Sequence, residues 1–179
     1  MPTGQEAEDR IALAYYYIWF RPECWPTKPA EGRLALEDIH PILGRYDSAD
    51  PEVIAAHIEM AQRARLDAFA VSWFHSPDWT AKLERVIEIA SGRDFKICID
   101  LEGDGRKPEE VYESLLYYLT AHREDQRVLR KEGVPVVLIW GTWRQRPEAW
   151  RAMFDRLEAE GAPGYFLPSH QLDPAYLIA

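Results

Sequence analysis

Apolar runs and amphipathic stretches alternate along this chain. Five apolar runs each end in aromatic or polar residues, and we predict that they form strands over 11–19, 66–74, 95–101, 135–140 and 164–168. The first run is continuous rather than alternating, which is typical of a parallel strand covered on both faces. Between the runs, apolar residues recur at helical spacing, so helices are expected to join the strands.

The starts of the helices are marked by caps and prolines. Asp50 is placed to cap a helix that begins at Pro51 and runs to about Arg65. A second helix is expected over 79–90, and two more begin at Pro108 and Pro147. Residues 1–10 are expected to form a flexible tail. The connection over 20–50 is long enough to suggest a functional loop, and the polar connection over 124–133 is expected to hold at most a short helical turn.

This alternation predicts βαβ units and a parallel sheet. The fold class is α/β, and the expected architecture is an incomplete (β/α)8 TIM barrel with four βα units and a fifth strand, in one domain over 11–179. An open doubly wound sheet would alternate in the same way. The barrel is favoured because YYYIWF, not a glycine-rich phosphate turn, follows the first strand, and because every strand ends in polar or aromatic residues. A full barrel typically has about 250 residues, so we expect the N-terminal part of one.

Composition narrows the partners. The chain has 179 residues, 47% of them hydrophobic, and a net charge of −9, which argues against nucleic acid and fits a neutral ligand. Seven Trp and nine Tyr favour either a site for ring-shaped ligands or a large mixed core. No run approaches the ~18 apolar residues of a membrane span. The polar N-terminus is not a secretory signal, so the chain as written is expected to be cytoplasmic, although a longer natural N-terminus would leave its location unknown.

Neither metal nor cofactor chemistry is indicated by the motifs. Cys98 lies in an apolar run and is expected to be a buried hydrophobe, whereas Cys24 lies in a loop. A disulfide between them has no support, and no metal-ligand spacing or nucleotide, nucleophile-elbow or zinc-protease motif is present. We therefore expect no cofactor and no metal.

Glu102 is the strongest candidate for chemistry. It follows an apolar strand in IDLEGDG, where a barrel strand gives way to its loop. A carboxylate there can bind sugar hydroxyls or act as acid, base or nucleophile. Asp100 should point to the same side by strand alternation. One strand rarely supplies both opposed carboxylates of a glycosidase, and Glu102 is alternatively a loop acid near Arg106.

Aromatic and histidine side chains at the other strand ends are candidates for sugar contacts. Packing between strands and helices is the competing interpretation for the aromatic residues, and His170 has no nearby acid in sequence with which to form a triad. The predicted substrate-binding residues are Tyr16, Tyr17, Trp19, Trp73, His75, Asp100, Trp140 and His170, with Glu102 as the catalytic candidate.

Two segments carry a resemblance to a known family. The run AYYYIWF and the later segment HPILGRYDSADPEVIAAHIEMAQRARLDAFAVSWF resemble glycoside hydrolase family 99 and the related WbsX-type proteins. The family pattern of an HP-x-LG-x-Y-x-S-x-DP loop and a strand ending in VSWF is matched by His40, Pro41, Leu43, Gly44, Tyr46, Ser48, Asp50, Pro51, Asp67, Val71, Ser72, Trp73 and Phe74. ICIDLEG resembles the strand that ends in the family's I-E motif, and EGVPVVLIW resembles a later strand.

The resemblance implies a (β/α)8 barrel acting as a retaining endo-α-mannosidase or endo-α-mannanase without a metal. The family's essential carboxylates lie in a W-N-E-W-x-E-like segment that this sequence does not contain. What carries over is one wall of the pocket: Tyr16 or Tyr17, Trp73, His75, Glu102 and Trp140. The sequence departs from the family at Arg65, where a glycine is usual, and at LEGDG in place of I-E-P.

Two functional predictions follow. The preferred one is a glycosidase-like protein that acts on α-mannoside-type glycans or polysaccharides in its full-length form. This chain by itself is expected to be inactive as a hydrolase. The alternative is a carbohydrate-binding or structural half barrel that self-associates through its exposed sheet edges. A doubly wound oxidoreductase is disfavoured because no cofactor fingerprint is present.

Overall fold

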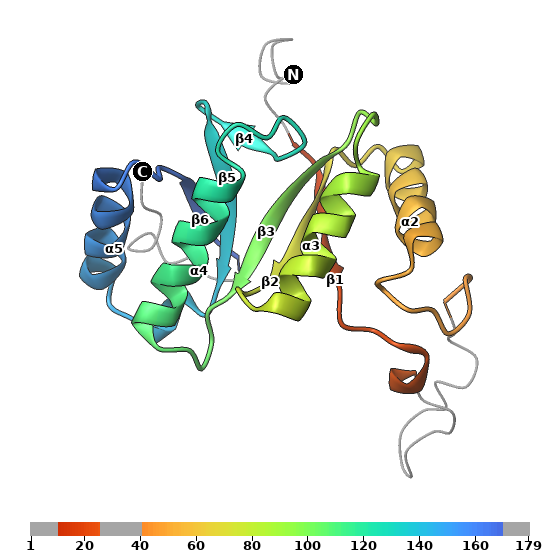
Figure 1. Ribbon diagram of the computed structural model, residues 1–179, viewed down its shortest axis with the longest axis horizontal. Coiled ribbons are helices and arrows are strands. Elements are labelled where there is room, and N and C mark those ends of the chain that lie inside the picture. The colour runs from red at the N-terminus through yellow and green to blue at the C-terminus, as the bar shows by residue number, and fades with distance from the viewer. Residues whose placement is uncertain (1–10, 26–40, 170–179) are drawn as a thin grey trace, which may run out of the picture.

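Strands and helices alternate through the part of the chain that the computed structural model describes, residues 11–25 and 41–169 (Figure 1). The parallel strands are β1 (Leu13–Tyr17), β2 (Ala68–Trp73), β3 (Lys96–Glu102), β5 (Val134–Trp140) and β6 (Tyr165–Pro168). The helices are α2 (Pro51–Arg63), α3 (Pro77–Ile89), α4 (Pro108–Ala121) and α5 (Pro147–Ala159), with short 3₁₀ turns η1 (Pro22–Cys24) and η3 (Thr142–Arg144). The predicted α/β class with βαβ units is confirmed. The tail over 1–10 lies outside the described residues.

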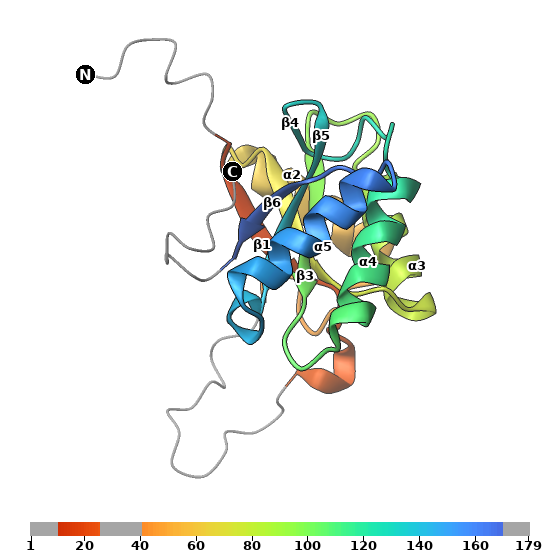
Figure 2. The same ribbon diagram turned by 90° about the vertical axis from the view of Figure 1, so that its left-hand side faces the viewer.

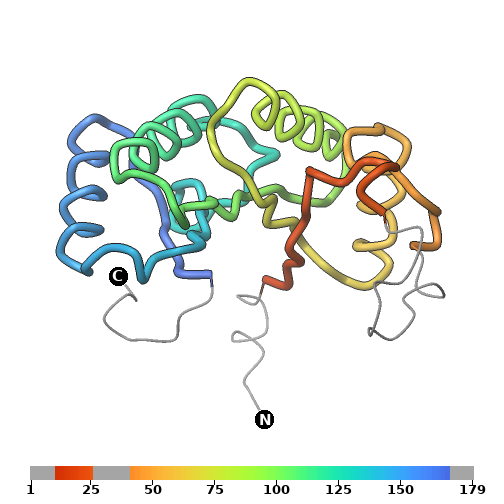
Figure 3. Tube along the Cα trace, turned by 90° about the horizontal axis from the view of Figure 1, so that it is seen from below, coloured from red at the N-terminus to blue at the C-terminus, as the bar shows by residue number. Residues whose placement is uncertain are grey.

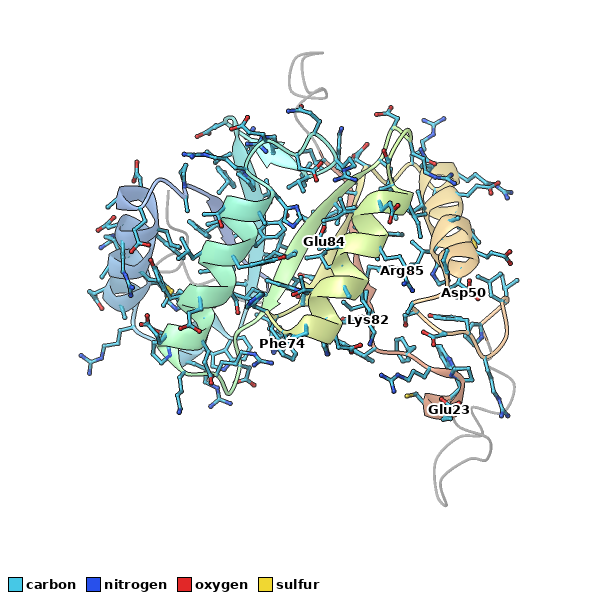
Figure 4. The ribbon with its side chains drawn as sticks, viewed as in Figure 1. Glu23, Asp50, Phe74, Lys82, Glu84 and Arg85 are labelled. Atoms are coloured by element: carbon cyan, nitrogen blue, oxygen red, sulfur yellow. The ribbon has the colours of Figure 1, made fainter. Side chains whose placement is uncertain are left out.

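Each helix begins at a proline, as the sequence predicts for three of them. The Asp50 carboxylate caps α2 by accepting from the Glu52 N–H at 2.9 Å. Arg85 of α3 donates to the Ala49 carbonyl at 2.9 Å, beside that cap, and so ties α3 to the start of α2 (Figure 4). The helix expected over 79–90 begins two residues earlier, at Pro77, because the Ser76 hydroxyl caps it.

The sheet is curved, and the helices lie in an arc outside it (Figure 3). Its order is β1-β2-β3-β5, with β6 also paired to β5, and all of these pairs are parallel. Side chains on the convex face, such as Val71, Ile99 and Leu101, are buried against the helices in the main core. Small side chains on the concave face, including Ala70 and Cys98, form a second apolar cluster. The two faces therefore offer different environments to residues that alternate along one strand.

The two edges of the sheet curl toward each other (Figure 2). Leu13 and Tyr15 of β1 and Tyr165 and Leu167 of β6 pack against the same concave cluster. The Tyr15 hydroxyl donates to the carbonyl of Ser169, just after β6, at 2.9 Å. This bond joins the first and last described strands across the concave face.

The connection over 124–133 differs from its prediction. It contains a short strand, β4 (Arg130–Lys131), which pairs with β5 in antiparallel fashion. The two residues between these strands, Glu132 and Gly133, have φ values of 54° and 82°. Positive φ at both positions is the type I′ geometry that closes a two-residue hairpin. The Glu-Gly pair was the available sequence signal for this turn.

None of the helices over 11–25 and 41–169 is both long and apolar enough to cross a membrane.

Candidate functional site

Glu102 lies at the carboxyl end of β3, on the concave face of the sheet. The Ser72 hydroxyl of β2 donates to its carboxylate. Ser72 pairs in register with Asp100, and Glu102 with Trp140 of β5. A hydroxyl, two carboxylates and an indole from three neighbouring strands therefore lie at one end of the sheet, as expected where parallel strands end.

Asp100 lies one row below Glu102 and is only 4% exposed. Strand alternation places both carboxylates on the concave face, as the sequence predicts. Tyr15 is near enough to Asp100 that burial first, and then that negative charge, raise the pKa of its phenol. The floor of the site therefore combines a carboxylate with the cross-sheet tyrosine.

Two glycines let the loops after β3 and β5 meet backbone to backbone. The Gly103 N–H donates to the Trp140 carbonyl at 2.9 Å, and a Cβ on Gly103 would lie 2.7 Å from that same oxygen. Gly141 has φ +89°, and a Cβ there would lie 2.6 Å from the Asp104 nitrogen. An ion pair between Arg144 and Asp104 spans the two loops. These contacts fix the backbone on which Glu102 and Trp140 stand.

Partly or largely exposed aromatic pairs lie on both sides of β2 and β3. Tyr17, the last residue of β1, and Trp19, which follows the strand, are 42% and 36% exposed, with ring centroids 4.6 Å apart. Trp140 and Trp143, which follow β5, have ring centroids 5.0 Å apart in an edge-on arrangement, and Trp143 is 38% exposed. Exposed rings beside hydrogen-bonding groups suit the apolar C–H faces of sugars.

The loop that carries the HP-x-LG-x-Y-x-S motif is fastened to the exit of β1. The Ser48 hydroxyl accepts from the Phe20 N–H at 2.9 Å and donates to the Phe20 carbonyl at 3.1 Å. The Trp25 indole N–H donates to the Tyr46 carbonyl at 3.0 Å. These bonds hold the loop beside the aromatic residues that follow β1.

Tyr16 and Trp73 do not line this site, and their assignment as sugar contacts is corrected. Trp73 is fully buried and packs near the rings of Tyr117 and Tyr118 of α4. Tyr16 is 8% exposed, stacks on Phe69 and has its hydroxyl 3.1 Å from Nδ1 of a histidine on α2. The physical reason is strand parity, since both residues alternate with Tyr15, Tyr17 and Ser72 and so face the helices.

His75 lies apart from Glu102, on the helix-covered side. Its backbone N–H donates to the Ser114 hydroxyl of α4 at 3.3 Å, and its ring stacks on that of Tyr117 with the ring centroids 4.2 Å apart. His170 lies outside the described residues. Of the predicted site residues, the structure gathers Tyr17, Asp100, Glu102 and Trp140 on the concave side, with Trp19 beside Tyr17.

Three neighbours were missed by the sequence reasoning. Ser72 and Tyr15 share the concave face with Glu102, and Trp143 contacts Trp140. Strand parity places Tyr15 on the same face as Tyr17. That Ser72 lies beside Asp100 depends on the register between β2 and β3, which the sequence pattern does not give.

The two cysteines are free thiols, Cys24 exposed and Cys98 buried. Within 11–25 and 41–169, no three His, Cys, Asp or Glu side chains gather in a way that could hold a metal ion.

Comparisons with known proteins identify the family and the fold. A family model described as glycosyl hydrolase family 99 matches residues 33–161. Two solved structures of the GH99 endo-α-mannosidase from Bacteroides thetaiotaomicron, one in complex with bis-tris-propane, superpose with a TM-score of 0.71 at 24% identity. They cover 87% of this chain, which spans 51% and 53% of theirs.

Two curated relatives are similar in sequence. A glycoprotein endo-α-1,2-mannosidase-like protein of Danio rerio is 24% identical over 124 residues, or 62% of this chain. A glycoprotein endo-α-1,2-mannosidase of Rattus norvegicus is 22% identical over 160 residues, or 75% of this chain. The chain spans only 28% and 34% of the lengths of these two relatives.

Proposed function

The chain belongs to glycosyl hydrolase family 99, and we propose that it forms one wall of a binding site for α-mannoside-type glycans or polysaccharides. The wall consists of the carboxyl ends of β1, β2, β3 and β5. The full-length protein would hydrolyse such glycans as a retaining endo-α-mannosidase.

The observation that carries this proposal is the placement of Glu102. Its carboxylate is held by Ser72 on the concave face of the sheet, between two aromatic pairs that each present exposed ring surface. A carboxylate accepts hydrogen bonds from sugar hydroxyls, and the neighbouring rings offer apolar platforms. The relatives' names concern α-1,2-mannosidic glycans, which supports the choice of ligand.

Hydrolysis needs more than this wall supplies. A retaining glycosidase uses two carboxyl groups about 5–5.5 Å apart on opposite sides of the scissile bond. Asp100 and Glu102 stand side by side on one strand, so they do not oppose each other across a sugar. We therefore expect the 179-residue chain alone to bind the glycan without hydrolysing it.

Calorimetric titration with α-1,2-mannobiose tests the binding site. We expect Glu102→Gln to weaken binding at least about tenfold, because a hydrogen bond to a charged group contributes about 1.5–3 kcal/mol. The matched control is Glu113→Gln, which changes an exposed carboxylate on α4, outside the sheet. Equal affinity of the two variants would contradict the proposal. Measurable hydrolysis by the purified chain would contradict the expectation that it binds the glycan without cleaving it.

A second function is favoured by the sheet edges. Among the described strands, β1 pairs only with β2 and β6 only with β5, so each has one side that no other described strand covers. Such edges pair readily with another chain, and a self-associating, non-catalytic carbohydrate-binding half barrel would use them. Light scattering distinguishes the two: a clean dimer supports this candidate, and a monomer that still binds mannobiose contradicts it.

A further inference from the structure

We propose that Ser72 is a positioning residue for Glu102, and that it fixes the direction in which the carboxylate meets a glycan. The inference rests on the proposed function for its consequence, but its physical core, the coupling of Ser72 to Glu102, is independent of any ligand. Ser72 would not touch the sugar itself, because its side chain is fully buried.

The register places the hydroxyl below and beside the carboxylate. Ser72 pairs with Asp100 across β2 and β3, and Glu102 stands two residues further along the same face. Diagonal neighbours of this kind are about 7–8 Å apart at Cα, within reach of a long side chain. The hydrogen bond from Ser72 to the Glu102 Oε1 therefore requires the glutamate to lean back along its strand.

The chemistry of the two groups fixes the direction of this bond. An ionised carboxylate can only accept, so the serine hydroxyl must donate. A buried hydroxyl costs free energy when it lacks a partner, and a hydrogen bond to an ionised acceptor is stronger than a neutral one. The fully buried Ser72 hydroxyl therefore depends on Glu102 for its partner, whereas the half-buried glutamate depends on Ser72 for its orientation.

The backbone of Glu102 is held separately, so the side chain is what remains to be positioned. The Glu102 carbonyl accepts from the Arg106 Nε at 2.8 Å, and the next N–H, of Gly103, donates to the Trp140 carbonyl at 2.9 Å. The Arg106 guanidinium is itself seated 3.4 Å from the centroid of the Phe74 ring. With the main chain fixed on both sides, the Ser72 bond restricts the remaining glutamate torsions, which is how a supporting residue preorganises a binding group.

A double-mutant cycle on stability tests the coupling without a ligand. We expect Ser72→Ala to lower the folded-to-unfolded ratio about tenfold in the wild-type chain, measured by urea unfolding. In a Glu102→Ala background the same substitution should leave the ratio unchanged or raise it, because it then removes a stranded hydroxyl. Ser114→Ala is the control, since that buried serine on α4 donates to the Glu110 carbonyl and should give the same change in both backgrounds.

Binding of α-1,2-mannobiose tests the consequence. Ser72→Ala should weaken binding about tenfold when Glu102 is present and less than about twofold in the Glu102→Ala background. Ser72→Cys, which replaces the hydroxyl with a slightly larger and weakly donating thiol, should behave like Ser72→Ala and also serves if the alanine variant does not fold. A merely structural serine would instead weaken binding equally in both backgrounds, which would overturn the proposal.

The two arms separate the proposals. If wild-type chain does not bind the disaccharide while the stability cycle shows coupling, the proposed function fails and the Ser72–Glu102 pairing stands. If the stability cycle is additive, Ser72 does not hold Glu102, whatever the chain binds.

Discussion

Replacing Arg65 with glycine should stabilise this protein. Arg65 follows α2 with φ 60°, in the left-handed region. Its N–H donates to the Gln62 carbonyl and the Leu66 N–H donates to the Ala61 carbonyl, both at 2.9 Å. This pair of bonds is the Schellman motif, whose left-handed position is normally glycine because a Cβ is strained there.

The end of α5 provides an internal comparison. Gly161 has φ 74° and makes the same two bonds, from its own N–H to the Glu158 carbonyl and from the Ala162 N–H to the Leu157 carbonyl. The same fold therefore uses glycine at one Schellman position and arginine at the other. The Arg65 side chain is exposed, so its removal should cost little packing.

The size of the effect follows from two opposing contributions. A left-handed backbone conformation costs an L-residue about 1–2 kcal/mol, which glycine avoids. Glycine in turn loses about 0.5–1 kcal/mol of stability, because its unfolded chain has more conformational entropy to lose on folding. The net gain for Arg65→Gly lies between about 0 and 1.5 kcal/mol, and its central value of about 0.75 kcal/mol corresponds to about 1.5–3 °C in Tm for a chain of this length.

Urea unfolding of three variants would check this reasoning. Arg65→Gly should be stabilised, and Gly161→Ala destabilised by a similar amount, because a Cβ at Gly161 meets only an ordinary contact 3.5 Å away and the cost is conformational. Arg63→Gly, in the last turn of α2, should lose about 1 kcal/mol. A loss of stability in Arg65→Gly comparable to that in Arg63→Gly would refute the argument.

Three further predictions concern Gly103, Cys98 and Asp125. Gly103→Ala should destabilise the chain by about 2 kcal/mol or more and weaken mannobiose binding, because its Cβ would meet the Trp140 carbonyl at 2.7 Å; an unchanged urea midpoint would contradict this. Burial, and then the charge of a nearby carboxylate, raise the pKa of Cys98 to about 12, so a thiol reagent at pH 8 should modify one cysteine in the native chain and two in denaturant. The hydrogen bond from Arg127 lowers the pKa of Asp125 to about 2, so this carboxylate stabilises the fold above about pH 4 and stops doing so as pH falls toward 2. The stability gap between wild type and Asp125→Asn should close over that range.

Much of the fold could be predicted from the sequence. The order of strands and helices, and the prolines that open three of the four described helices, follow from local patterns of apolar spacing and capping. The family and the barrel-type fold, predicted from the loop and strand motifs, are confirmed. The β4 hairpin was missed because a two-residue strand has too few residues for a pattern, although its Glu-Gly turn was visible in the sequence.

The candidate site was predicted less completely. The shared position of Asp100, Glu102 and Trp140 near the carboxyl ends of neighbouring strands follows from the sequence, because they end strands and alternate with apolar residues, and their role in binding stays a prediction. Tyr16 and Trp73 are buried on the helix-covered face instead, because the alternation of side chains along a strand, and not their aromatic character, decides which face they occupy. Ser72 went unnoticed as a functional partner, because a serine inside an apolar run carries no local signal of what it contacts.

The sequence by itself determined which residues stand at the ends of strands and, through the two-residue period, which of them share a face. Only the tertiary structure decided which face is covered by helices and which is concave, because that depends on how the sheet curves and where four helices pack. Register between neighbouring strands is also a tertiary property, since residues 72 and 102 are brought together by pairing across 30 positions of chain. The glutamate was evident from its place on one strand, whereas the serine that holds it became evident only when the next strand was laid beside it.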